Sequence, residues 1–230
     1  MTIVNFSHKF IYVHIPKTAG TSLKEYFRAF EQEGDIHIQR QADADRAVAS
    51  SHILLGKHSR AVQIRQAIGD DRFNSYFKFS LVRNPFDRTV STFLFLKHSF
   101  RNWSNSAVMD KFESLEPFVR SALFRRAGPS GIFEPQARWL LDSNGELTTD
   151  YVGRLESLES DVESILKALG LPMTSAAVPQ QNRSHGVRTQ LMSELSLGTV
   201  VDAIRLRYAR DFELFNYSLE PADTFASVDS

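Results

Sequence analysis

Short apolar runs alternate along the chain with stretches in which apolar residues recur every three or four positions. The runs predict buried strands, and the spaced stretches predict amphipathic helices. We expect strands at 10–15, 52–55, 76–82 and 147–155, and helices at about 21–31, 43–48, 59–69, 85–98, 107–126, 158–169 and 195–210. This alternation is typical of an α/β protein with a mostly parallel sheet and helices on both faces.

Residues that start or stop helices support several of these boundaries. Asn84 and Pro85 suit the cap and the first position of the helix that follows the strand at 76–82. Ser59 is expected to cap a helix, and Gly170 ends another. A proline inside the predicted helix 107–126 marks a break there.

The segment from Phe10 to Leu23 combines a predicted strand, a short loop and the start of a helix. Backbone N–H groups point outward at a helix N-terminus, where the helix dipole also favours negative charge. Gly20 would let the backbone approach a ligand closely, and Lys17 adds a cation. The segment therefore predicts a phosphate-binding loop. The alternative is a lysine and a few hydroxyls on a surface turn.

The order of residues in this loop differs from the phosphate loop of ATPases and GTPases. That pattern places a lysine directly after its last glycine, whereas Lys17 precedes Gly20 here. An enzyme that transfers phosphoryl groups with ATP and Mg²⁺ is thus one alternative function. A nucleotide-binding module without catalytic activity is another.

A second segment predicts a second anion site. Arg83 directly follows the predicted strand at 76–82, and Ser91 lies two helical turns beyond Asn84, on the same face. A guanidinium and a hydroxyl that converge at this strand end would hold a phosphate. The alternative is a buried Arg83 that pairs with an acid, with Ser91 serving only in packing.

Together, Pro16–Ser22 and Val82–Ser91 resemble the two phosphate motifs of sulfotransferases that use PAPS (3′-phosphoadenosine 5′-phosphosulfate). The resemblance is to the carbohydrate-type branch, found in bacteria and in animal Golgi enzymes. It runs from about 10 to 217 and continues at 56–59, 151–156, 181–184 and 211–217. It implies a P-loop-like three-layer fold in a single domain of residues 1–230, with 219–230 as a loose tail.

The resemblance also implies roles for individual residues. The first loop would hold the 5′-phosphosulfate through Pro16, Lys17, Thr18, Ala19, Gly20, Thr21 and Ser22. Arg83 and Ser91 would hold the 3′-phosphate, and Arg183 and Ser184 would contact the 3′-phosphate side or the adenosine. PAPS would be the donor and PAP the product, without a metal ion.

His58 is the candidate base. It follows the predicted strand at 52–55, so it lies at a strand carboxyl end, next to the phosphate loop if the two strands are neighbours. Histidine titrates near neutrality, which suits removal of a proton from the acceptor hydroxyl, and the resemblance places the base in this region. Lys17 would donate to the bridging oxygen as PAP leaves. The alternative for His58 is a surface histidine near a helix cap, and His14 is expected to be a hydrogen-bonded structural histidine.

Composition excludes several kinds of partner and of chemistry for this protein. The 230 residues carry a net charge of zero, so no basic surface predicts nucleic-acid binding. Cysteine is absent, which excludes disulfides, thiolate metal ligands and thiol nucleophiles. No apolar run is long enough to span a membrane and no signal peptide is evident, so we expect a cytoplasmic, bacterial protein.

The acceptor is expected to be a hydroxyl compound, with a carbohydrate first and a small molecule next. The stretch 95–139 is rich in aromatic and basic residues, which can stack on sugars and pair with acidic glycans: Phe100, Arg101, Trp103, Arg125, Arg126, Phe133 and Trp139. Core aromatics beside a solvated basic edge would give the same pattern.

Overall fold

The computed structural model describes residues 2–38, 55–104, 106–173 and 185–224. The chain divides into two compact units. The sheet unit comprises Met1–Val82 and Ala137–Gln181, and the helical unit comprises Arg83–Gln136 and Asn182–Ser230. A single domain across the whole chain stays a prediction.

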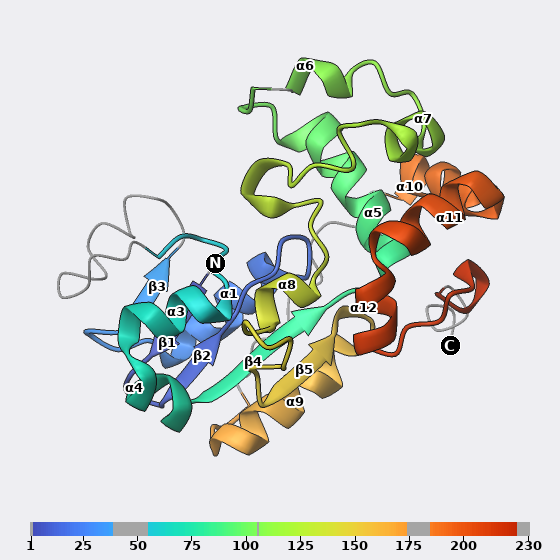
Figure 1. The fold of residues 1–230 in the computed structure, drawn as a ribbon. Helices are drawn as coiled ribbons and strands as arrows, with labels where there is room; N and C mark the ends of the chain where they lie inside the picture. Colours follow the sequence, from blue (N-terminus) through green and yellow to red (C-terminus); the bar gives the residue numbers. More distant parts are fainter. Residues whose placement is uncertain (1, 39–54, 105, 174–184, 225–230) are drawn as a thin grey trace. The chain divides into compact units, whose positions relative to one another are not determined.

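The described part of the sheet unit contains a five-stranded sheet (Figure 1). Its strands are β1 (Thr2–Asn5), β2 (Phe10–Tyr12), β3 (Ile36–Ile38), β4 (Phe77–Val82) and β5 (Tyr151–Arg154), in the order β3-β1-β2-β4-β5. β4 pairs in parallel with β2 and with β5, whereas β1 pairs antiparallel with β2 and with β3. The sheet is therefore mixed, and the expected mostly parallel arrangement is wrong.

The antiparallel part arises from β1, which the sequence pattern did not predict. β1 and β2 form a hairpin, and antiparallel neighbours need only a short connection. The Asn5 Oδ1 atom accepts the His8 N–H at 2.6 Å within the hairpin turn. Residues 39–54 lie outside the described residues. That range includes the predicted helix at 43–48 and all of the predicted strand at 52–55 except Leu55.

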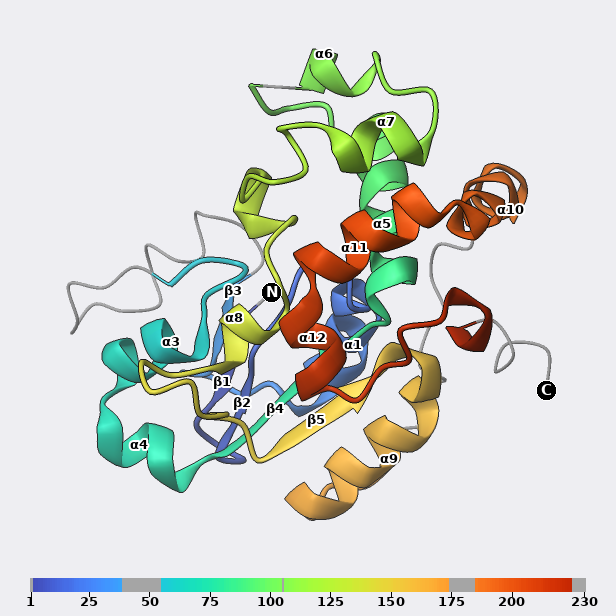
Figure 2. The ribbon, with the colours of Figure 1, turned by 45° about the vertical axis from the view of Figure 1, so that its right-hand side comes forward.

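Helices cover both faces of this sheet. On one face α1 (Gly20–Phe27), η1 (Arg28–Phe30) and α9 (Leu158–Leu169) share an apolar core with the strands. That core includes Phe10, Tyr12, Leu23, Phe27, Phe79, Leu81, Val162 and Ile165. Figure 2 shows α9 running alongside β5. The η4 turn (Leu155–Ser157) precedes α9, and Gly170 ends α9 in the left-handed conformation, as predicted.

The opposite face carries α3 (Ala61–Ile68), α4 (Asp70–Ser75) and α8 (Ala137–Leu140). Alternation along β4 turns Lys78 away from Phe79, and the Lys78 ammonium lies 5.6 Å from the centre of the Phe73 ring in α4. Figure 1 shows α3 and α8 in front of the strands. The predicted three-layer arrangement is therefore present in the sheet unit.

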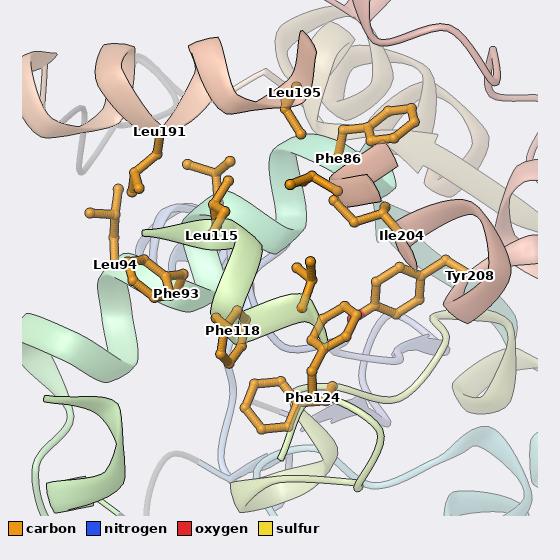
Figure 3. Packing of buried hydrophobic residues seen from close by; sticks show 14 of the residues in the cluster. Phe86, Phe93, Leu94, Leu115, Phe118, Phe124, Leu191, Leu195, Ile204 and Tyr208 are labelled. Atoms are coloured by element: carbon orange, nitrogen blue, oxygen red, sulfur yellow. The ribbon is translucent and has the colours of Figure 1, made fainter. Parts of the chain in front are cut away.

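The helical unit is built around α5. Its described elements are α5 (Pro85–Leu94), η2 (Phe95–Ser99), α6 (Ser106–Met109), α7 (Leu115–Arg120), η3 (Pro129–Gly131), α10 (His185–Ser193), η5 (Glu194–Ser196), α11 (Gly198–Arg207), α12 (Ala209–Leu214) and η6 (Pro221–Thr224). The Asn84 side chain accepts the Phe86 N–H at 2.9 Å, so the predicted cap is confirmed. Figure 3 shows side chains of α5, α7, α10 and α11 converging on one apolar core, among them Phe93, Phe118, Leu191 and Ile204.

Three helix predictions differ from the structure. Residues 107–126 form two short helices, α6 and α7, in place of one. Pro117 lies in the first turn of α7, where backbone N–H groups have no partner within the helix, so a proline breaks no hydrogen bond there. The region 195–210 divides into η5, α11 and α12. Arg60, and not Ser59, directly precedes α3, because the Ser59 hydroxyl accepts the Gly56 N–H instead. Among the described residues, no helix is long and apolar enough to cross a membrane.

Candidate active site

The loop that follows β2 has the backbone shape of an anion cradle. Strand pairing extends past Tyr12, since the Val13 N–H donates to the Phe79 carbonyl at 3.0 Å. Lys17 and Ala19 then adopt positive φ angles of 71° and 62°. These are strained conformations for residues with a side chain, and such strain persists mainly at functional sites. Left-handed residues beside right-handed ones form the concavities of backbone N–H groups that bind anions in many proteins.

Contacts inside the loop hold this shape. The Thr18 hydroxyl donates to the Ile15 carbonyl at 2.9 Å, and Thr18 is fully buried. Its side chain therefore braces the loop from within. α1 begins at Gly20, and Ser22 is buried in its first turn. Lys17 is half-buried at the start of the turn.

Gly20 is required by a neighbouring side chain. A Cβ atom at this position would lie 1.8 Å from Nε2 and 2.4 Å from Cε1 of His14. The imidazole of His14 therefore covers the Cα of Gly20 and packs the loop against the strand end. The structure shows a close approach to Gly20 by His14, and the expected close approach of a ligand stays a prediction.

His14 also contacts His58, the predicted base. The two rings are 4.4 Å apart between centroids and inclined by 35°. Nδ1 of His58 lies 3.2 Å from the carbonyl oxygen of His14. Because a carbonyl only accepts, this bond requires a hydrogen on Nδ1, and the neutral ring then carries its lone pair on Nε2. The structure thus brings His58 to the phosphate loop through His14.

The surroundings hold both imidazoles in place. The Trp139 indole N–H donates to the His58 carbonyl at 3.1 Å. Burial is the largest cause that lowers the pKa of His14 well below its usual range, and nearby positive groups, among them His58 and Lys57, lower it further, so His14 is neutral at physiological pH. The turn that carries His58 is tied to β1, because the Thr2 hydroxyl donates to the Gly56 carbonyl at 2.8 Å.

The second motif lies in the helical unit. Nε of Arg83 donates to Oδ2 of Asp87, one turn along α5, at 2.7 Å. Arg188 of α10 forms an ion pair with the other carboxylate oxygen of Asp87. Arg83 therefore pairs with an acid, as in the alternative interpretation. Two guanidinium groups therefore share this one carboxylate. Ser91 lies in α5 and is half-buried.

The sequence analysis missed Arg188. An arginine on an amphipathic helix gives no local signal of its partner, because Asp87 lies 101 residues away in the chain. Arg183 and Ser184 lie outside the described residues. Phe133 and Trp139 are core residues rather than exposed aromatic platforms. No group of histidines and carboxylates that could hold a metal ion occurs among the residues that the structure describes.

A loop of this shape, between the carboxyl end of a parallel strand and a helix N-terminus, is typical of α/β proteins that bind phosphate groups. The model of the sulfotransferase family matches residues 1–218, so the chain belongs to the sulfotransferase family.

Several curated relatives are carbohydrate sulfotransferases. Carbohydrate sulfotransferase 14 of Danio rerio is 25% identical over 96% of this chain and 63% of its own length. Carbohydrate sulfotransferase 10 of Mus musculus is 26% identical over 91% of this chain and 65% of its own length. An uncharacterised protein of Archaeoglobus fulgidus is 29% identical over 49% of this chain. The chain thus spans somewhat less than two thirds of these two vertebrate relatives, and no solved structure matches it.

Proposed function

We propose that this protein is a PAPS-dependent O-sulfotransferase that moves a sulfuryl group from PAPS to an acceptor hydroxyl on a carbohydrate. The observation that carries the proposal is the packing of His58 and His14 against the loop of Lys17 and Gly20. This packing supports the assignment of His58 as the general base, since its ring lies beside the loop that we assign to the donor. The family match supports the reaction type, and the names of the relatives support a carbohydrate acceptor.

In this proposal the sheet unit is a P-loop-like fold whose loop receives the 5′-phosphosulfate of the donor. The backbone N–H groups of residues 17–20 and the start of α1 offer partial positive charge to the phosphate and sulfate oxygens. Thr21 and Ser22 follow in the first turn of the helix. The Lys17 ammonium adds a full positive charge to these partial charges.

The reaction is an in-line transfer. The acceptor oxygen forms a bond to sulfur while the bond between sulfur and the bridging oxygen breaks, and the electron pair of that bond leaves on PAP. Nε2 of His58 takes the hydroxyl proton, and Lys17 donates to the bridging oxygen. Because charge develops on that oxygen only as the bond breaks, Lys17 stabilises the transition state more than the bound donor.

A metal ion is not part of this proposal. A sulfuryl group carries less negative charge than a γ-phosphoryl group, so Lys17 and the helix N-terminus replace the shielding that Mg²⁺ gives in phosphoryl transfer. We assign the 3′-phosphate to Arg83 and Ser91, with Arg183 and Ser184 on the adenosine side.

A thermal-shift series with PAP, AMP, ADP and ATP tests the proposal. A ligand that binds only the folded state raises the melting temperature by mass action, and PAP should raise it most. Arg83→Ala should abolish the preference for PAP over AMP. Arg120→Ala is the matched control, because Arg120 also pairs with a carboxylate one turn away on a helix, Glu116. Equal stabilisation by PAP and AMP, or a larger shift with ATP that depends on Mg²⁺, would contradict the proposal.

A further inference from the structure

The backbone of Arg83 is held by a buried side-chain amide. Oε1 of Gln136 accepts the Arg83 N–H at 2.9 Å, and Nε2 of the same side chain donates to the Arg83 carbonyl at 2.8 Å. Gln136 is fully buried. Its amide therefore pairs with the peptide of Arg83 as a neighbouring strand would, although Arg83 lies beyond the last residue of β4.

Gln136 is in turn held by Asp211, a residue of α12. The Gln136 backbone N–H donates to Oδ2 of Asp211 at 2.7 Å, and Nε2 lies 3.4 Å from the same oxygen. Asp211 is fully buried as well. Buried polar groups are costly unless they are paired, so this arrangement tolerates little displacement of either residue.

A second buried contact fixes the chain just before Gln136. The guanidinium of Arg88, in α5, donates to the carbonyls of Ile132 and Glu134 at 3.1 and 3.0 Å. Arg88 is almost completely buried and lies over the Tyr208 ring. Residues 132–136 are therefore held on one side by α5 and on the other by α12, so the amide of Gln136 has a defined position.

We propose that Gln136 is a positioning residue: its amide fixes the peptide of Arg83, and thereby the point from which the Arg83 guanidinium reaches the donor's 3′-phosphate. This inference rests on the proposed function, which assigns the 3′-phosphate to Arg83. The backbone is set by Gln136 and the side chain is set by Asp87, so the arginine is organised before any ligand binds. Preorganisation of this kind strengthens binding without an additional contact to the ligand.

Calorimetric titration with PAP and AMP tests the inference, because the two ligands differ only in the 3′-phosphate. Gln136→Met keeps the approximate size of the side chain and removes both bonds to Arg83. It should weaken PAP binding about 10- to 100-fold and change AMP binding little, in line with the usual effect of misplacing a binding group. Gln136→Glu, which keeps the acceptor for the Arg83 N–H and loses the donor, should shift the PAP-to-AMP ratio in the same direction if Gln136→Met does not fold.

Two controls separate positioning from a general loss of stability. Val200→Ala removes buried apolar volume from the core of the helical unit and leaves Arg83 in place. It should therefore leave the PAP-to-AMP affinity ratio unchanged. In an Arg83→Ala background, Gln136→Met should change that ratio no further. If the parent protein prefers PAP and both Gln136 variants keep that preference, the inference is overturned. If the parent protein itself shows no preference, the proposed function fails, and the inference fails with it.

Discussion

The imidazole of His14 occupies the space that a side chain at Gly20 would need, with Nε2 only 1.8 Å from the position of a Cβ atom. The two residues come from the two ends of the phosphate loop, so their contact closes it. Positive φ angles fall at Lys17 and Ala19 and not at Gly20. The glycine is therefore needed for packing and the lysine and alanine carry the backbone strain.

Replacement of Gly20 by alanine should destabilise the protein. The added methyl group overlaps ring atoms of the buried His14 side chain, and overpacking of this kind costs about 1–3 kcal/mol of unfolding free energy. Urea unfolding followed by circular dichroism measures the change. Gly198→Ala is the control, because nothing lies within 4 Å of its Cβ position, and it should change the unfolding free energy by only a few tenths of a kcal/mol.

The double variant Gly20→Ala with His14→Ala then tests the cause of that loss. Removal of the imidazole makes room for the methyl group, so the two effects should not add. Additive losses of stability would show that the overlap is not the reason why residue 20 is a glycine.

His58→Ala should remove most of the sulfotransferase activity and leave PAP binding intact. Loss of a general base usually lowers kcat about 10²- to 10⁴-fold. Transfer of sulfate from PAPS to a carbohydrate acceptor measures the rate. His8→Ala is the matched control, since His8 lies in the turn at the opposite end of β2. Unchanged turnover in the His58 variant would remove this residue from the role of base.

Asp87→Ala should lower the unfolding free energy by about 1–2 kcal/mol, because it leaves two partly buried guanidinium groups without their shared carboxylate. The side chains of Arg83 and Asp87 are only 11% and 14% exposed. Asp110→Ala removes an ion pair with Arg101 in which the two side chains are 56% and 39% exposed, and it should cost clearly less than Asp87→Ala because solvent screens an exposed pair. Equal losses in the two variants would argue against a special role for the Asp87 cluster.

Stability should fall as the pH is lowered below about 6.5, with His14 as one cause. The pKa of His14 is lowered in the folded state, so the unfolded chain binds a proton that the folded protein does not. This contribution is complete above the unfolded pKa, near 6.5, and is lost progressively as the pH falls toward the folded pKa. Each such proton gives a slope of about 1.4 kcal/mol per pH unit.

Unfolding free energies of the parent protein and of His14→Gln between pH 7.5 and 5 test this expectation. The slope should be shallower in the variant, because glutamine does not titrate. Identical slopes in the two proteins would assign the acid sensitivity to other groups.

Several elements of this chain could be predicted from the sequence because the residues that indicate them lie close together in the chain. A cap residue followed by proline starts α5, and a glycine ends α9, since both depend on backbone geometry within one turn. The strand, loop and helix start between Phe10 and Leu23 were predicted for the same reason. β1 was not predicted, because its pairing with β2 and β3 depends on the tertiary structure. That pairing makes the sheet mixed. The prediction of one helix at 107–126 was wrong, because helical spacing of apolar residues does not require one continuous helix.

The sequence by itself determined the strand, loop and helix that form the cradle, the cap at Asn84, and the candidates Lys17, His58 and Arg83. Only the tertiary structure placed the His14 ring over Gly20, joined Arg188 to Asp87, and set the Gln136 amide against Arg83. The physical reason is that dihedral preferences and helix capping act between near neighbours in the chain. Ring packing, ion pairs and buried hydrogen bonds instead join residues that are distant in the chain, such as Arg188 and Asp87, which lie 101 positions apart.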